Sequence, residues 1–233
     1  MIKALLTHIK EGVKESNSMG SKQFIIEGNI GCGKSTLLEK LSYEDNIEVF
    51  MEPLNAWQDI KDANGDSILD VFYKDPKRYA YLFQSIVFKT RLRSLDVPQK
   101  KPIRLMERSI LTDNHVFMQS MIDMDMVSSM ERECYNQWYD WLKDKCFVNP
   151  TAIIYIRSSP EVCYHRIAGR GRTAEATIST EYLEKLHDKH DEWLYAWTGC
   201  PVHIVDNPMH KDIDELVDEV KKLINSFTCS DNE

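Results

Sequence analysis

The chain has 233 residues, of which 42% are hydrophobic and 28% charged, and its formal net charge is −8. This composition is that of one globular α/β domain with a single large core, neither disordered nor fibrous. The sequence contains no run of 18 apolar residues that could span a membrane, and its acidic charge disfavours a nucleic-acid polymer as a partner.

Two features of the sequence bear on location and domain organisation. Six cysteines without a CxxC pair indicate reduced thiols, so we expect a cytoplasmic protein, with a mitochondrial form left open. Residues 1–20 contain two glutamates and no arginine, are too polar for a secretory signal, and fit a transit peptide poorly. We expect them to form a flexible extension before a single domain of residues 21–233.

Short apolar segments alternate with longer amphipathic ones along this domain. Five short segments read as strands buried on both faces, because their apolar residues run on without alternation: 24–26, 47–51, 103–106, 152–156 and 202–205. Helical patterns cover seven other segments: 34–42, 76–95, 110–124, 130–145, 160–168, 180–197 and 211–227. Since strands separated by helices pair in parallel, the sequence predicts a doubly wound, five-stranded parallel sheet flanked by helices.

The first strand leads directly into a phosphate-binding sequence. The pattern G-x-x-x-x-G-K-[ST] is matched by Gly28, Asn29, Ile30, Gly31, Cys32, Gly33, Lys34, Ser35 and Thr36. Glycines let the backbone curl so that N–H groups point at phosphate oxygens, and the following helix adds its positive N-terminal end. Lys34 is expected to reach the β and γ phosphates, and the Ser35 hydroxyl to ligate Mg²⁺. The motif predicts a P-loop that binds ATP with Mg²⁺.

Three further features favour a small-molecule kinase among P-loop proteins. The sequence has neither an N-K-x-D guanine signature nor an apolar run ending in Asp-Glu, and its second strand ends in Glu52-Pro53. Late in the chain, arginines gather around two glycines: Arg157, Arg166, Arg170 and Arg172. Planar guanidinium groups suit the charge on a transferring phosphoryl group, so we expect an Arg-rich lid over the phosphates. A solvated basic turn is the alternative.

In these motifs the chain resembles the deoxynucleoside kinase family, which includes deoxycytidine, deoxyguanosine and insect multisubstrate kinases. The resemblance runs from about residue 23 to 205 through ordered stretches: 26–36, 52–53 with Trp57, 73–76, 83–85, 106–109, 154–162, 166–172 and 181–187. It implies a homodimeric enzyme of nucleotide salvage that uses ATP and Mg²⁺ to phosphorylate the 5′-hydroxyl of a deoxynucleoside.

The resemblance also implies catalytic roles. Glu52 resembles the general base, which accepts the 5′-hydroxyl proton as that oxygen attacks the γ-phosphorus. Arg108 resembles the residue that holds this carboxylate and the 5′ oxygen, and Glu107 resembles a Mg²⁺ ligand that acts with Ser35. The other catalytic residues implied are Lys34, Arg170 and Arg172, with Arg166, Arg170 and Asp206 at the bound nucleotide.

Sugar and base recognition are implied in the same way. Tyr73 and Glu175 resemble the pair that holds the 3′-hydroxyl, and the Tyr73 ring would leave little room for a ribose hydroxyl. Gln84 offers one donor and one acceptor to an amide-like base edge. Phe117, together with Phe83 or Trp57, resembles the aromatic residues that stack on both sides of the base. A plain core role is the alternative for these residues.

Arg91 and Asp113 bear on base preference. Arg91 lies seven residues after Gln84 on the same helix face. An Arg–Asp pair resembles the deoxycytidine and purine kinases, whereas the thymidine-accepting branch has smaller or apolar residues there. Val87 and the short segment 57–73 depart from the deoxycytidine kinase pattern. We expect deoxycytidine or a deoxypurine to be favoured over thymidine; a salt bridge without substrate contact is the alternative.

Some residues have a less specific pattern. One group of methionine and aromatic residues could lie equally well in a dimer interface or in the core: Met118, Met121, Met124, Met126, Met130, Trp138, Tyr139 and Trp141. His187 and His190 could share a metal ion, although a solvated helix face fits them better. Two other functions stay open: a nucleoside monophosphate kinase of the thymidylate type, in which Glu52 would repel the acceptor phosphate, and a nucleotide-binding regulatory module without catalysis.

Overall fold

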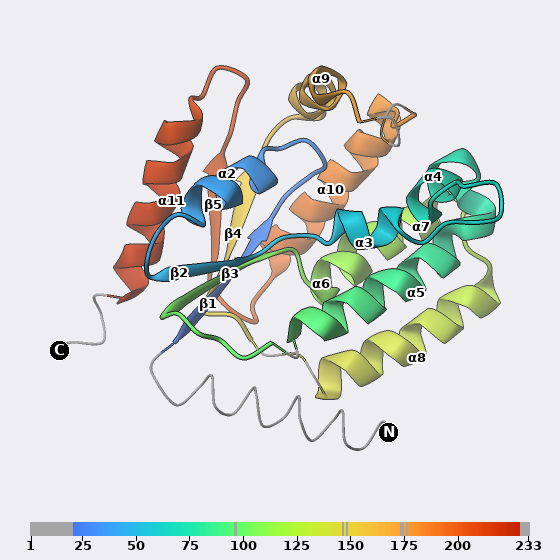
Figure 1. Ribbon diagram of the computed structural model, residues 1–233, viewed down its shortest axis with the longest axis horizontal. Helices are drawn as coiled ribbons and strands as arrows, with labels where there is room; N and C mark the ends of the chain where they lie inside the picture. The colour runs from blue at the N-terminus through green and yellow to red at the C-terminus, as the bar shows by residue number, and fades with distance from the viewer. Residues whose placement is uncertain are drawn as a thin grey trace.

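The computed structural model describes residues 21–95, 97–145, 147, 149–172, 175 and 177–228. The extension expected at residues 1–20 lies outside these described residues. A five-stranded parallel sheet forms the centre, with the order β2-β3-β1-β4-β5 (Figure 1). Its strands are β1 (Lys22–Glu27), β2 (Ile47–Phe50), β3 (Ile103–Glu107), β4 (Ala152–Arg157) and β5 (Val202–Asp206). All five strands predicted from the sequence are confirmed, each to within two residues at either end.

Helices cover both faces of this sheet, which makes the fold doubly wound. Helix α11 packs against α2 on one side, while α5, α8 and α10 lie on the other (Figure 1). The helical elements are α2 (Lys34–Leu41), α3 (Leu54–Gln58), α4 (Ile68–Lys74), α5 (Pro76–Leu95), α6 (Ile110–Thr112), the π-helical η2 (Asp113–Met118), α7 (Gln119–Asp123), α8 (Ser129–Lys145), α9 (Pro160–Arg170), α10 (Thr180–Ala196) and α11 (Ile213–Thr228).

Two short helices, α3 and α4, were not predicted; they lie at the two ends of the segment 57–73. Helix α4 begins with a capping box: the Ser67 hydroxyl accepts from the Asp70 N–H at 3.1 Å, and the Asp70 carboxylate accepts from the Ser67 N–H at 3.0 Å. This reciprocal pair satisfies two backbone donors that a helix start leaves free. The S-x-x-D spacing could have revealed α4.

The P-loop curls between β1 and α2. Gly28 has φ 143°, a conformation that L side chains rarely adopt, and a Cβ there would collide with the Ile156 carbonyl oxygen of β4. The loop can therefore lie against the sheet only with glycine at this position. Helix α2 then buries Leu37, Leu38 and Leu41 completely, which fixes the loop relative to the core.

The methionine-rich segment proved to be partly core. Met118 and Met121 are fully buried and Tyr139 is nearly so, so these three residues are not available to an interface. By contrast, Met130 on α8 is 71% exposed and Trp138 is 52% exposed. Met130 and Trp138 are therefore the residues of this group that lie most open to a partner.

The histidine pair is neither a metal site nor a solvated face. His190 is fully buried, with Nδ1 2.7 Å from the Leu186 carbonyl oxygen, and burial lowers its pKa to about 3. His187 lies beside Arg157, with Nε2 3.2 Å from its Nη2. Within the described part of the chain, no group of three or more His, Cys, Asp or Glu residues could hold a metal ion.

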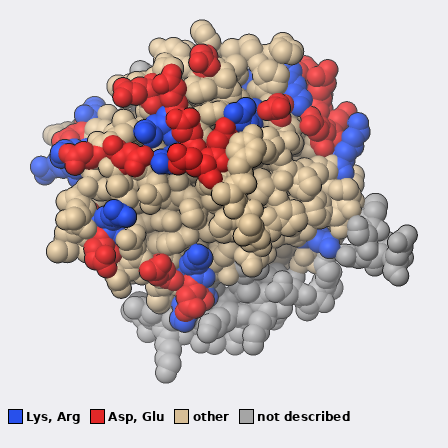
Figure 2. Space-filling view, turned by 180° about the vertical axis from the view of Figure 1, so that it is seen from behind, with Lys and Arg blue, Asp and Glu red and all other residues tan. Residues whose placement is uncertain are grey.

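The described surface agrees with an acidic chain that carries mixed charge. Figure 2 shows acidic and basic side chains interleaved across one face, where they do not gather into a basic stripe. Such mixing produces no extended positive field on this face. Among the described residues, no helix has the length and apolar character needed to cross a membrane.

Candidate active site

A cavity of about 420 Å³ opens where the carboxyl ends of β1, β2 and β3 meet. Open α/β sheets bind ligands at this edge. The P-loop lines one part of the cavity, through Gly31, Gly33, Lys34, Ser35 and Thr36 together with Ile30. A largely apolar part is lined by residues of α4, α5, η2 and α7. The cavity is large enough to take small organic ligands.

The P-loop is held by hydrogen bonds from several elements. Lys34 Nζ donates to the carbonyl oxygens of Gly28 and Asn29, each at 2.8 Å. Asn29 Nδ2 donates to the Leu183 carbonyl oxygen on α10 at 2.8 Å, and Asn207 Nδ2 donates to that of Cys32 at the same distance. Three P-loop residues do not line the cavity and instead take part in these supporting hydrogen bonds: Gly28, Asn29 and Cys32. The other predicted P-loop residues line the cavity.

The two expected Mg²⁺ ligands come together at the P-loop helix. The Ser35 hydroxyl donates to Glu107 Oε1 at 2.8 Å, and Glu107 Oε2 accepts from the Glu52 N–H at 3.2 Å. They meet because β1 and β3 are neighbours in the sheet and both end at this edge. A hydroxyl and a carboxylate form an all-oxygen set, which fits a hard ion such as Mg²⁺.

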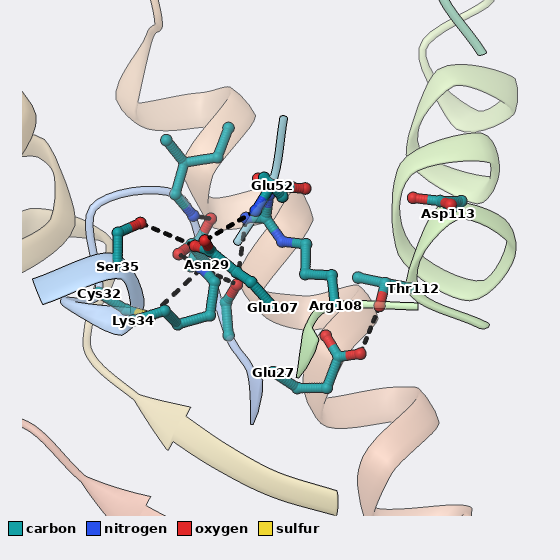
Figure 3. Close-up of polar contacts among 12 residues, drawn as sticks. Glu27, Asn29, Cys32, Lys34, Ser35, Glu52, Glu107, Arg108, Thr112 and Asp113 are labelled. Atoms are coloured by element: carbon teal, nitrogen blue, oxygen red, sulfur yellow. Dashed lines mark hydrogen bonds and ion pairs between the residues drawn. The ribbon is translucent and has the colours of Figure 1, made fainter. Parts of the chain in front are cut away.

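Glu52 lies between two buried arginines. Arg108 Nη1 donates to Glu52 Oε2 at 2.6 Å (Figure 3). Arg91 Nη2 donates to Glu52 Oε1 at 3.2 Å. Burial opposes the charged form of this carboxyl, but Arg108 and Arg91 outweigh burial and hold the pKa of Glu52 below its ordinary value. Glu52 is therefore ionised at neutral pH and lines the same cavity as Lys34.

Arg91 and Asp113 form the predicted ion pair. Arg91 donates through Nε at 3.1 Å and through Nη2 at 3.2 Å to the two carboxylate oxygens of Asp113, and its Nη1 donates to the Glu107 carbonyl oxygen at 3.0 Å. Asp113 lines the cavity, whereas Arg91 lies behind it and is not a lining residue. Arg91 therefore acts on the cavity through the residues that it holds.

The predicted arginine cluster is divided in the structure. Arg166, Arg170 and Arg172 line the cavity, and Arg170 Nε donates to Glu175 at 2.7 Å. Arg157, by contrast, donates to Asp191 on α10 at 2.8 Å and is not among the lining residues. Three of the four arginines of the predicted lid therefore line the cavity, because Asp191 holds Arg157 elsewhere.

Asp206 is likewise not a lining residue. It ends β5, and its carbonyl oxygen accepts from Lys211 Nζ at 2.8 Å. The residues that line the cavity here are Asn207, Met209, Lys211 and Ile213. Asn207 follows Asp206 directly, and its side chain also holds the P-loop. The role of Asp206 at the bound nucleotide stays a prediction.

Aromatic residues surround the apolar part of the cavity. Phe83 meets Trp57 edge-on with ring centres 5.2 Å apart and stacks on Phe72 at 5.0 Å. Phe117 lies 4.8 Å from the Arg108 guanidinium group, which links the aromatic wall to the charged centre. Phe83 and Trp57, considered as alternatives from the sequence, both line the cavity.

Polar groups of this apolar part are few. Gln84 is 1% exposed, its Nε2 lies 3.9 Å from Met121 Sδ, and its Oε1 has no hydrogen-bond partner among the described residues. Val87 and Tyr73 also line the cavity, as predicted for substrate residues. Lining residues that sequence reasoning missed are Leu54, Leu69, Phe72, Met121 and Tyr182. Tyr182 lies within the stretch 181–187 that resembles the family, and Phe72 directly precedes the stretch 73–76.

A second buried carboxyl lies beneath this site, at the end of β1. Glu27 is fully buried, its Oε1 accepts from the Thr112 hydroxyl, and its Oε2 has no partner among the described residues (Figure 3). Burial raises the pKa of Glu27 to about 7, although Thr112, Arg108 and Lys34 oppose the shift. Glu27 thus changes charge near neutral pH.

We expect Glu27 to make the protein less stable as the pH rises. Its pKa in the folded chain lies above that in the unfolded chain, so the folded state binds more protons between these values. The contribution is complete below the unfolded pKa and is lost as the pH rises through about 7. Between pH 5.5 and 8 the loss amounts to about 2 kcal/mol in the free energy of unfolding.

Urea unfolding at these two pH values tests this expectation. The Glu27→Gln variant should lose about 2 kcal/mol less than the wild type over this interval. Glu39→Gln on α2, at an exposed position, is the control and should follow the wild type. Equal pH dependence of the wild type and Glu27→Gln would show that Glu27 does not titrate in this range.

Comparisons with known proteins agree with this geometry. Residues 24–227 match the model of the deoxynucleoside kinase family. The chain is 39% identical over 175 residues to a probable deoxycytidine kinase of Fowlpox virus, covering 74% of this chain and 72% of that protein. It is 32% identical to human deoxycytidine kinase (88% and 92% covered) and 32% identical to human mitochondrial thymidine kinase 2 (87% and 76% covered).

These relatives are kinases, so the alternative of a regulatory module without catalysis is not retained. The matching family model describes deoxynucleoside kinases, and the similar proteins named above are also deoxynucleoside kinases. The alternative of a nucleoside monophosphate kinase is therefore without support. The match covers most of the chain and includes every element that lines the cavity. The chain therefore belongs to the deoxynucleoside kinase family and is an enzyme that transfers a phosphoryl group from ATP to a deoxynucleoside.

Proposed function

We propose that this enzyme phosphorylates the 5′-hydroxyl of deoxycytidine or a deoxypurine by in-line transfer, with Glu52 as the general base. The observation that carries this proposal is the position of the Glu52 carboxylate. It lines one continuous cavity with Lys34 of the P-loop and with Gln84 and Phe117 of the apolar part. A nucleoside with its base among the aromatic residues would present its primary alcohol to Glu52.

The proton transfer follows from the charges around Glu52. Because its pKa is held low, Glu52 is ionised and can accept a hydrogen bond from the 5′-hydroxyl. As the 5′ oxygen bonds to the γ-phosphorus, the bond from that phosphorus to the bridging oxygen of ADP breaks, and the hydroxyl proton moves to Glu52. Arg108 lies 2.6 Å from the carboxylate and would keep it aimed at the attacking oxygen.

Lid and P-loop residues would stabilise the transferring group. Arg166, Arg170 and Arg172 offer guanidinium donors to its equatorial oxygens, and Lys34 a point charge. Ser35 and Glu107 would hold Mg²⁺, which neutralises phosphate charge when bound. Glu175 accepts from Arg170 and lines the cavity, so a sugar held by Glu175 and Tyr73 would couple to this lid.

The fixed charges beside the base favour an amino-bearing base over thymine. Asp113 is 2% exposed and is held by Arg91 from two donors, so its orientation is constrained. Gln84 Oε1 and Asp113 supply acceptors, which an exocyclic amino group can satisfy. Thymine presents a keto oxygen where such a base has its amino group; this oxygen cannot donate to an acceptor, and the 5-methyl group of thymine needs additional room.

We also propose a cytoplasmic homodimer that uses the exposed Met130 and Trp138 of α8.

Phosphoryl transfer from labelled ATP to each of the four deoxynucleosides tests this proposal. The product should be the 5′-monophosphate, and kcat/KM for deoxycytidine or a deoxypurine should exceed that for thymidine by about tenfold or more. Thymidine as the preferred substrate would refute the role of the Arg91–Asp113 pair. Transfer to the 3′-hydroxyl would refute the role of Glu52.

A further inference from the structure

Arg108 has a backbone conformation that residues other than glycine rarely adopt. Its φ is 63°, in the left-handed region, which costs an L-residue about 1–2 kcal/mol. Such a conformation persists only where neighbouring contacts hold it, and it occurs preferentially at functional sites. The groups that hold the Arg108 backbone therefore decide where its guanidinium group lies.

Hydrogen bonds hold the peptide groups on both sides of Arg108. On one side, the Arg108 N–H donates to the Ile26 carbonyl oxygen of β1 at 3.1 Å. On the other side the chain turns into α6, and the Ser109 N–H donates to Thr112 Oγ1 at 3.0 Å. The Ser109 hydroxyl in turn accepts from the Leu111 N–H at 3.1 Å. The turn that follows Arg108 thus depends on the Thr112 hydroxyl.

The orientation of this hydroxyl is set by Glu27. Thr112 Oγ1 donates its proton to Glu27 Oε1 (Figure 3). Because the proton points at Glu27, a lone pair of the same oxygen is free to accept from the Ser109 N–H. Oε1 can accept whether or not Oε2 carries a proton, so the change of charge at Glu27 leaves this contact in place. A chain of hydrogen bonds therefore leads from Glu27 to the peptide group after Arg108.

The guanidinium group of Arg108 is held by the same part of the chain. Arg108 Nη2 donates to the Gly28 carbonyl oxygen at 3.3 Å, and Nη1 donates to Glu52 Oε2 at 2.6 Å. Gly28 directly follows Glu27 in the sequence. The end of β1 and the first P-loop residue thus fix both the backbone of Arg108 and the position of its guanidinium group beside Glu52.

A carboxyl at position 27 is not explained by packing alone. Glu27 is fully buried, and Thr112 is the one hydrogen-bond partner of its carboxyl among the described residues. Burial of a carboxyl costs free energy that an apolar side chain of similar size would not cost. The acceptor that Glu27 supplies to Thr112 gives this carboxyl a reason to be there.

We propose that Glu27 is a positioning residue for phosphoryl transfer. Through Thr112 it holds Arg108 in the left-handed conformation, and Arg108 in turn keeps Glu52 aimed at the 5′-hydroxyl. This inference rests on the proposed function, in which Glu52 is the general base. Neither Glu27 nor Thr112 lines the cavity, so both act on the rate only through residues that do. Loss of their contact should slow the transfer and leave ATP binding nearly unchanged.

The variant Thr112→Val removes the hydroxyl and keeps the shape of the side chain. We expect kcat to fall about tenfold or more, because Arg108 and Glu52 leave the reactive geometry, while KM for ATP changes by less than about twofold. Thr112→Ser retains the hydroxyl and should restore kcat to near the wild-type value. Thr151→Val is the matched control: its hydroxyl accepts from the Gln23 N–H at 3.1 Å near the start of β1, and kcat should stay unchanged.

A crystal structure of Thr112→Val tests the inference without turnover. We expect Arg108 to adopt a negative φ and its Nη1 to lie more than about 3.5 Å from Glu52 Oε2. An Arg108 that keeps this conformation and this contact would overturn the inference, as would an unchanged kcat or a Thr112→Ser variant as slow as Thr112→Val. A normal kcat in Glu52→Gln would refute the proposed function, while the position of Arg108 in Thr112→Val would still decide the role of Glu27.

Near-ultraviolet circular dichroism checks that Thr112→Val retains the packing of the wild type. If this variant does not fold, Glu27→Met removes the acceptor instead and carries the same expectations for kcat and for Arg108. Glu27→Gln retains an acceptor oxygen and is then the variant that should restore kcat. Equal kcat values in Glu27→Met and Glu27→Gln would contradict the positioning role.

Discussion

The Glu52→Gln variant is expected to lose a factor of about 10² to 10⁴ in kcat, while its affinity for ATP stays nearly unchanged. Glutamine keeps the shape of the side chain but cannot accept the 5′-hydroxyl proton as a carboxylate does. The P-loop contacts of Lys34, Ser35 and Glu107 remain, so ATP binding should survive. Steady-state kinetics and calorimetric titration with ATP measure the two quantities.

A neighbouring glutamate on β2 provides the control for this variant. Glu48 accepts from Arg104 at 2.7 Å and is not among the residues that line the cavity. Glu48→Gln therefore removes a comparable ion pair without touching the acceptor site, and its kcat should be close to that of the wild type. A normal kcat in Glu52→Gln, or equal losses in both variants, would refute the general-base role.

Removal of one partner from the Arg91–Asp113 pair should be more damaging than removal of both. The side chains of these residues are 7% and 2% exposed, so Asp113→Ala leaves a buried guanidinium group with Glu52 as its remaining carboxylate partner. We expect this variant to lose about 3 kcal/mol of stability, at the lower end for a broken buried pair. The double variant Arg91→Met/Asp113→Ala should recover most of this loss, because neither charge then stays uncompensated.

The same double variant should change base preference. With the Asp113 carboxylate gone, the cavity wall next to the base gains room for a 5-methyl group and loses an acceptor for an amino group. The ratio of kcat/KM for thymidine to that for deoxycytidine should rise by about tenfold or more. Urea unfolding and kinetics with both nucleosides measure these effects.

Glu48→Ala/Arg104→Met is the matched pair outside the cavity, since its members bind each other at 2.7 Å. It should leave base preference unchanged. Strictly additive stability losses at Arg91 and Asp113 would show that the two side chains are not coupled. An unchanged thymidine ratio would show that the pair is an ordinary salt bridge.

The features predicted well from the sequence are those that depend on local pattern and on sheet geometry. Strands such as Ala152–Arg157 are buried along nearly their whole length, so they appear as continuous apolar runs. Ser35 and Glu107 could be expected to meet because parallel strands that are neighbours end at one edge. The P-loop has a sequence signature because few residues other than glycine can adopt its backbone conformation.

The features that were missed depend on contacts between distant segments. Arg157 lies outside the cavity because Asp191, 34 residues later, binds it. For Met118 and Met121 the sequence left the core and a dimer interface open, and their burial in the core depends on the packing of η2 and α7 against neighbouring helices. The π-helical form of Asp113–Met118 likewise has no marker in a sequence that reads as one continuous helix.

The most direct measurement is a crystal structure of the enzyme with a deoxynucleoside joined through its 5′ oxygen to the phosphates of adenosine. We expect the phosphates on Gly28–Thr36, the base beside Gln84 and Phe117, and a Glu52 carboxylate oxygen about 2.6–3.2 Å from the 5′ oxygen. A 5′ oxygen remote from Glu52, or a nucleoside bound outside this cavity, would contradict the mechanism.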